Sequence, residues 1–244
     1  MKVGIKVWPD VPLEYVRRIR DHVDFFELYA FPDHGYDDFL GIGRPIIIHN
    51  AHSFNKVNFA DPAKGKINLA SLMWSQHLAD RFDSSKIIIH PELAENPACN
   101  IDSVRDFVRK HHDRRMMIEN MPPAVHGFRH LVNTPEDVES VIRPCRIGFC
   151  LDLSHAFEYA HYFGLDVRPF IQRMVDLKPS HFHMTDTKLE KKPIGSYREI
   201  HMNFWEGGID LDMLKGLLPK DAEVTIETPQ VFEKQIKEIG FLRS

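Results

Sequence analysis

The sequence has few cysteines, no strong excess of charge of either sign and no long apolar run. Its three cysteines, Cys99, Cys145 and Cys150, form no C-x-x-C pair, which fits a reduced cytoplasmic protein. The formal net charge of −4 gives the whole chain no strong attraction to nucleic acid, although a local basic groove stays open. No apolar stretch approaches the roughly 20 residues of a membrane span. The N-terminal MKVGIKVWPD has no apolar signal core. We therefore expect a cytoplasmic protein without a membrane partner.

Eight short apolar runs recur along the 244 residues, whose 43% hydrophobic content is enough for one large core. The runs are rich in Ile, Val, Phe and Met and mostly do not alternate with polar residues. Such a pattern is typical of parallel strands that are buried on both faces. The predicted strands span residues 2–7, 25–30, 45–50, 86–91, 115–120, 146–152, 180–186 and 223–228.

Segments with apolar residues at helical spacing lie between these runs. The predicted helices span residues 12–22, 67–82, 102–112, 135–142, 168–177, 210–218 and 231–239. The glycines and the proline of residues 31–44 leave room for only a degenerate helix. This order predicts a single (β/α)8 TIM barrel over residues 1–244. A doubly wound open sheet is the alternative, but the glycine-rich loop that it normally carries after the first strand is replaced here by WPDVP.

Histidines and carboxylates stand at the C-terminal ends of six consecutive predicted strands. They are His49, His52, His90, Glu119, Asp152, His155, His181, His183, Asp186 and Glu227. Each of these residues alone is ordinary at a strand end. We expect His155 to lie in a loop after the sixth strand. In a barrel, however, these ends form one rim, where so many ionisable groups would repel and desolvate one another. A divalent cation compensates for this, and mixed nitrogen and oxygen ligands suit Zn, Mn or Fe better than Ca or Mg. The sequence therefore predicts a metal site at this rim.

The segment after the seventh strand adds further candidates. Glu199 and His201 alternate around one apolar residue, so in an extended loop both side chains would point to one side and could share a metal. An incidental pair in a solvated loop is the alternative. Lys188 and Arg198 lie near the proposed mouth of the barrel, where they could meet a phosphate or a carboxylate. The candidates for substrate binding are His49, Asp186, Lys188 and Arg198.

Seven motifs together resemble those of endonuclease IV and, more broadly, of the xylose-isomerase-like TIM barrels of AP endonuclease family 2. They are HSFNKVNFADP (52–62), IIIHP (87–91), MIEN (117–120), CLDLSHAF (150–157), FHMTD (182–186), EIH (199–201) and IET (226–228). The resemblance implies a DNA-repair hydrolase that holds up to three ions, usually zinc, and cleaves the phosphodiester beside an abasic site.

The same resemblance implies a role for each candidate ligand. His52 and His90 would hold a first metal, and Glu119 would bridge it to a second. The second site would be completed by Asp152, His183 and Glu227, and the third would consist of His155, Glu199 and His201. The family has aspartate where this chain has Glu199.

The isomerases and epimerases of the superfamily imply a different reaction. They typically use one metal, held by the equivalents of Glu119, Asp152, His183 and Glu227. Glu119 and Glu227 would then also transfer a proton on a keto sugar, and His155 would contact the sugar. The candidate catalytic residues are therefore Glu119, Glu227 and His155.

The chain also departs from endonuclease IV where that family grips DNA. The loops after the first two strands are short, and Asn55 stands where the family has a tyrosine. We therefore expect a metal-dependent phosphoesterase with a reduced DNA-binding surface, acting on a small phosphorylated or sugar substrate or on damaged DNA. The alternative is a single-metal isomerase, and a non-enzymatic binding protein ranks last. We expect a monomer or a small homo-oligomer.

Overall fold

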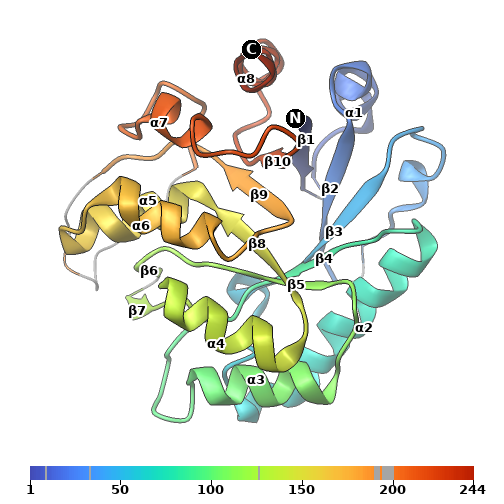
Figure 1. Ribbon diagram of the computed structural model, residues 1–244. Helices are drawn as coiled ribbons and strands as arrows, with labels where there is room; N and C mark the ends of the chain where they lie inside the picture. Colours follow the sequence, from blue (N-terminus) through green and yellow to red (C-terminus); the bar gives the residue numbers. More distant parts are fainter. Residues whose placement is uncertain (9, 33, 126, 190–192, 194–200) are drawn as a thin grey trace.

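Eight parallel strands close into a barrel in the computed structural model, which describes residues 1–8, 10–32, 34–125, 127–189, 193 and 201–244 (Figure 1). The strands are β1 (Lys2–Val7), β2 (Phe25–Ala30), β3 (Ile46–Asn50), β4 (Ile87–Ile89), β5 (Met116–Glu119), β8 (Gly148–Asp152), β9 (His181–Met184) and β10 (Glu223–Ile226). Around the barrel their order is β1-β10-β9-β8-β5-β4-β3-β2. Each lies within a predicted strand, so the predicted TIM barrel is confirmed.

Helices surround the strands in Figure 1. They are α1 (Leu13–Ile19), α2 (Gly65–Arg81), α3 (Ile101–Lys110), α4 (Pro135–Cys145), α5 (Leu153–Phe163), α6 (Val167–Val175), α7 (Leu211–Lys215) and α8 (Phe232–Arg243). Short 3-10 turns are η1 (Arg20–His22), η2 (Asp37–Phe39), η3 (Ser53–Asn55) and η4 (Pro62–Lys64). The single turn η2 agrees with the degenerate helix predicted for residues 31–44. No helix in the described part of the chain has the length and apolar character to cross a bilayer.

Helix α5 was not predicted, and it corrects the placement of His155 in a loop. The Asp152 side chain ends β8 and at once caps α5, because it accepts the backbone N–H of His155 at 2.8 Å. The helix therefore follows the strand without an intervening loop, and its apolar residues continue those of the strand in the sequence. The hairpin of β6 (Ala124–Val125) and β7 (Phe128–Arg129) was not predicted either.

The strands send alternate side chains outward to the helices and inward to the barrel axis. The outward set belongs to the large core, with Ile46 and Ile48 of β3 as examples. A small apolar cluster comes from the other face of the strands, and it consists of Phe25, Ile47, Ile88, Met117 and Cys150. Cys150 packs in this cluster, and burial raises the pKa of its thiol to about 12. The next inward positions along the strands are polar, and they form the candidate site.

Candidate metal centre

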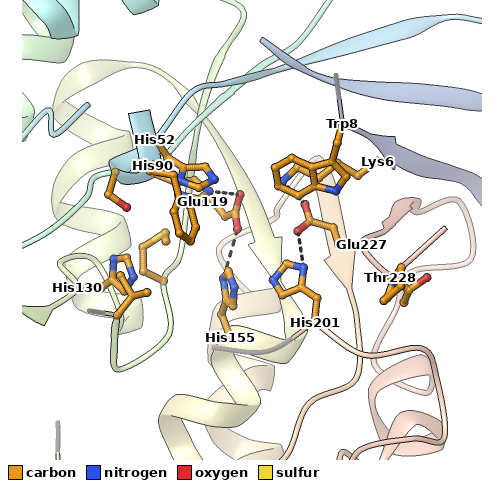
Figure 2. A pocket seen from close by; sticks show the side chains of 15 residues that line it. Lys6, Trp8, His52, His90, Glu119, His130, His155, His201, Glu227 and Thr228 are labelled. Carbon is orange, nitrogen blue, oxygen red and sulfur yellow. Dashed lines mark hydrogen bonds and ion pairs between the residues drawn. The ribbon is translucent and has the colours of Figure 1, made fainter. Parts of the chain in front are cut away.

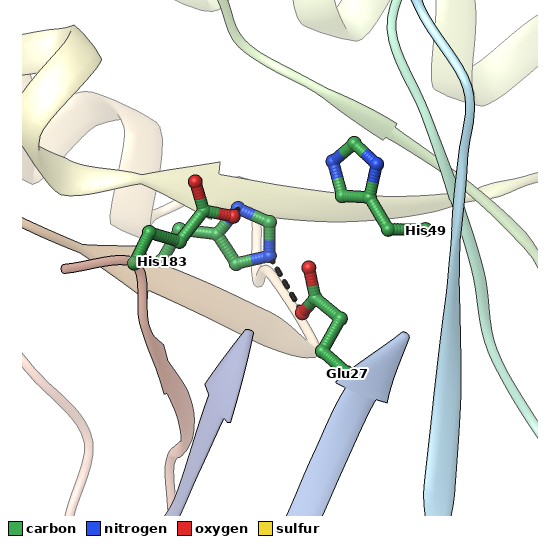
Figure 3. Close-up of side chains that lie close together, drawn as sticks. Glu27, His49 and His183 are labelled. Carbon is green, nitrogen blue, oxygen red and sulfur yellow. Dashed lines mark hydrogen bonds and ion pairs between the residues drawn. The ribbon is translucent and has the colours of Figure 1, made fainter. Parts of the chain in front are cut away.

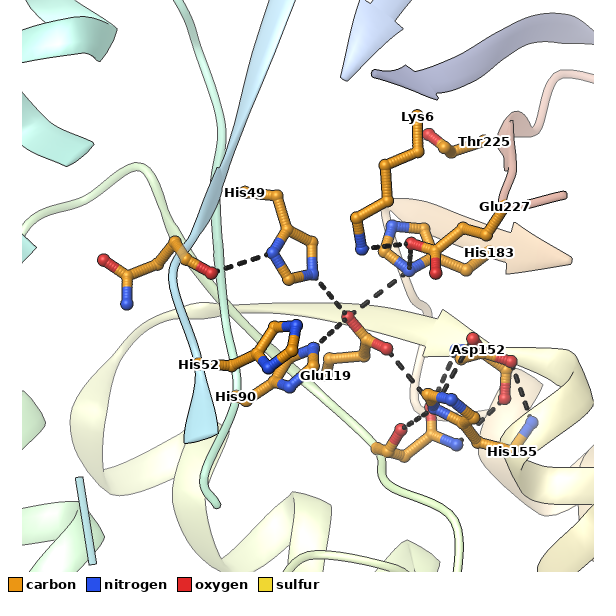
Figure 4. A network of polar contacts seen from close by, with 12 residues as sticks. Lys6, His49, His52, His90, Glu119, Asp152, His155, His183, Thr225 and Glu227 are labelled. Atoms are coloured by element: carbon orange, nitrogen blue, oxygen red, sulfur yellow. Dashed lines mark hydrogen bonds and ion pairs between the residues drawn. The ribbon is translucent and has the colours of Figure 1, made fainter. Parts of the chain in front are cut away.

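The polar side chains at the C-terminal end of the barrel interior converge on one carboxylate (Figure 4). They come from every strand of the barrel or from the residue that directly follows it, and all are buried. The set consists of Lys6, Glu27, His49, His90, Glu119, Asp152, His183 and Glu227. Parallel strands place these residues together because each set of inward side chains meets around the barrel axis.

Glu119 lies at the centre of this set. Its Oε2 atom is 3.3 Å from His49 Nε2, 3.2 Å from His90 Nε2 and 3.3 Å from His183 Nδ1. Its Oε1 atom is 3.3 Å from His155 Nδ1. Burial alone would raise the pKa of Glu119, but the neighbouring His183 and His90 hold it well below its usual range. This ionised carboxylate therefore stays our candidate for a bridging ligand.

The first group of possible ligands faces the axis and consists of Glu27, His49, His183 and Glu227 (Figure 3). One ligand atom from each residue lies within 4.8 Å of the others. His183 connects them, because its Nε2 donates to Glu27 Oε2 at 2.9 Å while its Nδ1 lies 2.9 Å from Glu227 Oε1. We call these four residues the axial group.

The second group consists of His52, His90 and Glu92 and lies beside the first. The rings of His52 and His90 stack with their centroids 4.8 Å apart. His90 turns its Nδ1 toward Glu92 Oε1, at 3.5 Å, and its Nε2 toward Glu119. We call these three residues the lateral group. Glu119 thus lies between histidines of both groups.

The protonation of His49 indicates that a cation fits here. Its Nδ1 faces the carbonyl oxygen of Asn50 at 2.9 Å, and a carbonyl only accepts, so Nδ1 carries the proton. Burial lowers the pKa of His49 to about 4, so the ring is neutral near pH 7 and Nε2 holds a lone pair. That lone pair points at the ionised Glu119, which is unfavourable unless positive charge lies nearby, on the protonated rings of His90 and His183 or on a metal ion that replaces their protons. Imidazole nitrogens with carboxylate oxygens fit a divalent ion such as zinc.

Lys6 and Glu27 belong to the site although strand ends alone did not indicate them. Lys6 donates from Nζ to Glu227 Oε1 at 2.7 Å and lies 3.8 Å from Glu27 Oε1. Both side chains are fully enclosed in the barrel. The sequence did carry a signal, because each residue interrupts an apolar strand, in GIKV and in FFEL. A charged residue inside a strand buried on both faces needs a partner.

Asp152 and His155 lie together beside Glu119. Asp152 Oδ2 is 3.4 Å from His155 Nδ1, and burial raises the pKa of this aspartate. His155 Nδ1 also meets the carbonyl oxygen of Asn120 at 3.0 Å, which directs its proton there. His201 is near this pair, with its ring centroid 6.3 Å from that of His155 and its Nδ1 3.6 Å from Glu227 Oε2. Glu199, the remaining residue of the predicted third site, lies outside the described residues.

The predicted substrate-binding residues have separate positions. Asp186 accepts backbone N–H bonds from Thr187 and Gly207 at 2.8 Å each and from Ile209 at 3.1 Å. Both of its oxygens are thus engaged by the chain, and we assign Asp186 to loop structure rather than to a substrate. Lys188 is exposed, His49 is buried in the axial group, and Arg198 lies outside the described residues.

A cavity of about 310 Å³ is lined by several of these candidate ligands (Figure 2). Its polar lining includes Lys6, His52, His90, Glu119, His155, His201 and Glu227. Trp8 and Phe54 add aromatic surface, and Phe54 is 70% exposed. The cavity is within the size range of sites for small molecules, which start at roughly 300 Å³.

Zinc binding to this centre is expected to release protons and to become tighter as the pH rises. Burial alone would lower the pKa of His90, but Glu119 and Glu92 raise it to about 9 in the metal-free protein. Its proton therefore competes with a metal at neutral pH, and affinity should rise about tenfold per pH unit for each proton released. Calorimetric titrations in buffers of different ionisation enthalpy measure the release. Binding without proton release between about pH 6 and 8 would contradict this assignment.

Comparisons with known proteins agree with the motifs. The family model described as "Xylose isomerase-like TIM barrel" matches residues 39–244. A "Probable endonuclease 4" of Mesomycoplasma hyopneumoniae (strain 7448) is 26% identical in an alignment 242 residues long, and the alignment covers 88% of this chain and 82% of the relative. The crystal structure of endonuclease IV from Thermus thermophilus has a TM-score of 0.73 at 17% identity, covering 100% of this chain and 98% of that one. The crystal structure of a D-tagatose 3-epimerase-like protein also has a TM-score of 0.73 at 17% identity, with coverages of 99% and 96%. At these identities the two structures show the fold alone.

Proposed function

The chain belongs to the xylose isomerase-like TIM barrel family, and we propose that it is a metal-dependent phosphoesterase similar to endonuclease IV. The observation that carries the proposal is the position of Glu119 between the axial and the lateral group. One metal needs only one of these groups. Two groups joined by a shared carboxylate favour more than one metal, which is the arrangement typical of phosphoryl hydrolysis.

The residues fall into sets that would each hold an ion. His52, His90 and Glu119 would hold the first, while Glu119 with Asp152, His183 and Glu227 would hold the second. His155 and His201 are the described candidates for a third. When bound, divalent ions would supply positive charge against the phosphate oxygens and activate water.

The chain's own residues orient and stabilise the substrate. Lys6 lines the cavity, and although burial alone would lower its pKa, Glu227 and Glu27 raise it, so Nζ stays cationic. A fixed ammonium at this position can meet a phosphate oxygen by a charge-assisted hydrogen bond. Glu227 also lines the cavity, and its pKa lies below the usual range because His183 and Lys6 outweigh the effect of burial. Glu227 is therefore suited to act as a ligand or a proton acceptor and not as an acid.

The cavity supports a small substrate. Its volume of about 310 Å³ matches one sugar or nucleoside unit better than a length of duplex. Trp8 and Phe54 offer aromatic faces on which a planar or sugar ring can stack. We therefore propose a small phosphate ester as the substrate and place DNA second.

A single-metal isomerase or epimerase is the second candidate. Glu119 and Glu227 come from different strands and line the same cavity, as two carboxylates that move a proton on a keto sugar must do. The endonuclease IV structure and the epimerase-like structure have the same TM-score to this chain. The fold therefore does not distinguish phosphoester hydrolysis from isomerisation.

Metal content and activity together separate the candidates. We expect two or more zinc ions per chain and zinc-dependent hydrolysis of bis(p-nitrophenyl) phosphate, lost on chelation and restored by zinc. A short duplex with an abasic site tests the DNA substrate, and a panel of keto sugars tests the isomerase. One metal per chain with conversion of a keto sugar and no phosphoester hydrolysis would overturn the proposal.

A further inference from the structure

Glu92 occupies an unfavourable position that glycine would fill without strain. Its backbone φ is +77°, in the left-handed region that non-glycine residues rarely adopt. Its side chain is completely buried, and neither carboxylate oxygen accepts a hydrogen bond from the described residues. Backbone strain and the burial of this carboxyl group both oppose folding, and the contact that offsets them is the one with His90.

The Glu92 carboxylate faces a histidine of the lateral group. Its Oε1 lies 3.5 Å from Nδ1 of His90, and the opposite nitrogen of that ring, Nε2, lies 3.2 Å from Glu119 Oε2. The backbone at this point is held, because the carbonyl oxygen of Glu92 accepts the N–H of Leu131 at 3.0 Å. The side chain is therefore presented to His90 from a fixed position.

The same arrangement occurs on the other side of Glu119. His183 turns Nδ1 toward Glu119 Oε2, at 3.3 Å, and donates from Nε2 to the buried Glu27 at 2.9 Å. Two of the three histidines that face this oxygen thus have a buried carboxylate behind their other nitrogen, while the third, His49, has the carbonyl oxygen of Asn50 there. A carboxylate in this place fixes the tautomer and the orientation of a metal-binding imidazole and increases its basicity.

We propose that Glu92 is a positioning residue of the metal centre, which accepts the Nδ1 proton of His90 and directs Nε2 of that ring to the metal shared with Glu119. The inference rests on the proposed metal centre and adds a residue to it that neither the strand-end pattern nor the resemblance indicates. It also gives a reason for the strained backbone, since glycine would relieve the strain but leave His90 unsupported.

The test compares full-length Glu92→Gly with the parent protein in two measurements. The first is the unfolding temperature after chelation, which should stay within about 4 °C of the parent because relief of backbone strain offsets the lost contact with His90. The second is the zinc dissociation constant from competition with a chromogenic chelator, which should increase about 10–100-fold. Glu92→Gln should largely retain zinc affinity, because its amide oxygen can still accept the His90 proton.

Asp83→Gly is the matched control. Asp83 is an exposed residue with a φ of +50°, so its replacement relieves backbone strain away from the site and should not change zinc affinity. Unchanged zinc affinity in Glu92→Gly would overturn the inference. So would an equal loss of zinc affinity in Glu92→Gln. Absence of zinc binding by the parent protein would instead overturn the proposed metal centre.

Discussion

Replacing Glu119 by glutamine is expected to remove bound metal and to lower phosphoester hydrolysis by on the order of 100-fold or more. The substitution keeps the shape of the side chain but removes its charge. Four histidine nitrogens lie 3.2–3.3 Å from the two carboxylate oxygens, so this carboxylate joins the axial and the lateral group. An amide also turns an N–H₂ group toward some of these rings, which removes a ligand atom. Elemental analysis and kcat/KM with bis(p-nitrophenyl) phosphate measure both effects.

Glu223→Gln is the control for this substitution. Glu223 begins β10, the strand that Glu227 directly follows. It pairs with Lys2 and Lys86 at the opposite end of the barrel. Its replacement should leave metal content and kcat/KM unchanged. Full metal content and full activity in a folded Glu119→Gln variant would contradict the bridging role of this carboxylate.

The strands and most residues of the candidate metal centre follow from the sequence because one physical rule covers both. Runs such as IIIHN and MMIE are apolar enough to be buried on both faces, and parallel strands bring their C-terminal ends to one rim. Reading the last residue of each run therefore identified Glu119, Asp152 and Glu227 as neighbours in space. The structure places Glu119 and Glu227 on one cavity, and Asp152 beside His155 at Glu119.

The supporting residues could not be derived in the same way, because their roles depend on contacts across the barrel. Lys6 meets a residue 221 positions later, and Glu27 meets His183, which lies 156 positions later. Such pairs appear only when the register of the closed barrel is known. Glu92 follows His90 closely in sequence, but its significance comes from its backbone angle and its burial. Helix α5 was missed for a local reason, since Asp152 serves as strand end and helix cap at once.

Lys6→Met is expected to destabilise the metal-free protein by about 3–5 kcal/mol, which is the usual effect of removing one partner from a buried ion pair. The Lys6 ammonium is enclosed, bonds Glu227 at 2.7 Å and lies 3.8 Å from Glu27. Methionine fills most of the space but leaves these carboxylates short of one positive charge. The pKa of Glu227 is depressed in the folded state, so its contribution is present at neutral pH and is lost as the pH falls. The loss of stability in Lys6→Met should therefore shrink toward acid pH.

Urea unfolding with a chelator and with excess zinc tests the reason for this effect. If Lys6 compensates the same carboxylates that hold a metal, zinc should restore a large part of the lost stability, because the ion binds the folded state and supplies the missing charge. Lys2→Met is the control on the same strand, since its exposed pair with Glu223 should contribute little with or without zinc. An equal loss for Lys6→Met in chelator and in zinc would mean that Lys6 acts through packing. Recovery with zinc would instead mean that the lysine and the metal share one set of carboxylates, and that the metal-free barrel depends on Lys6 to hold them ionised.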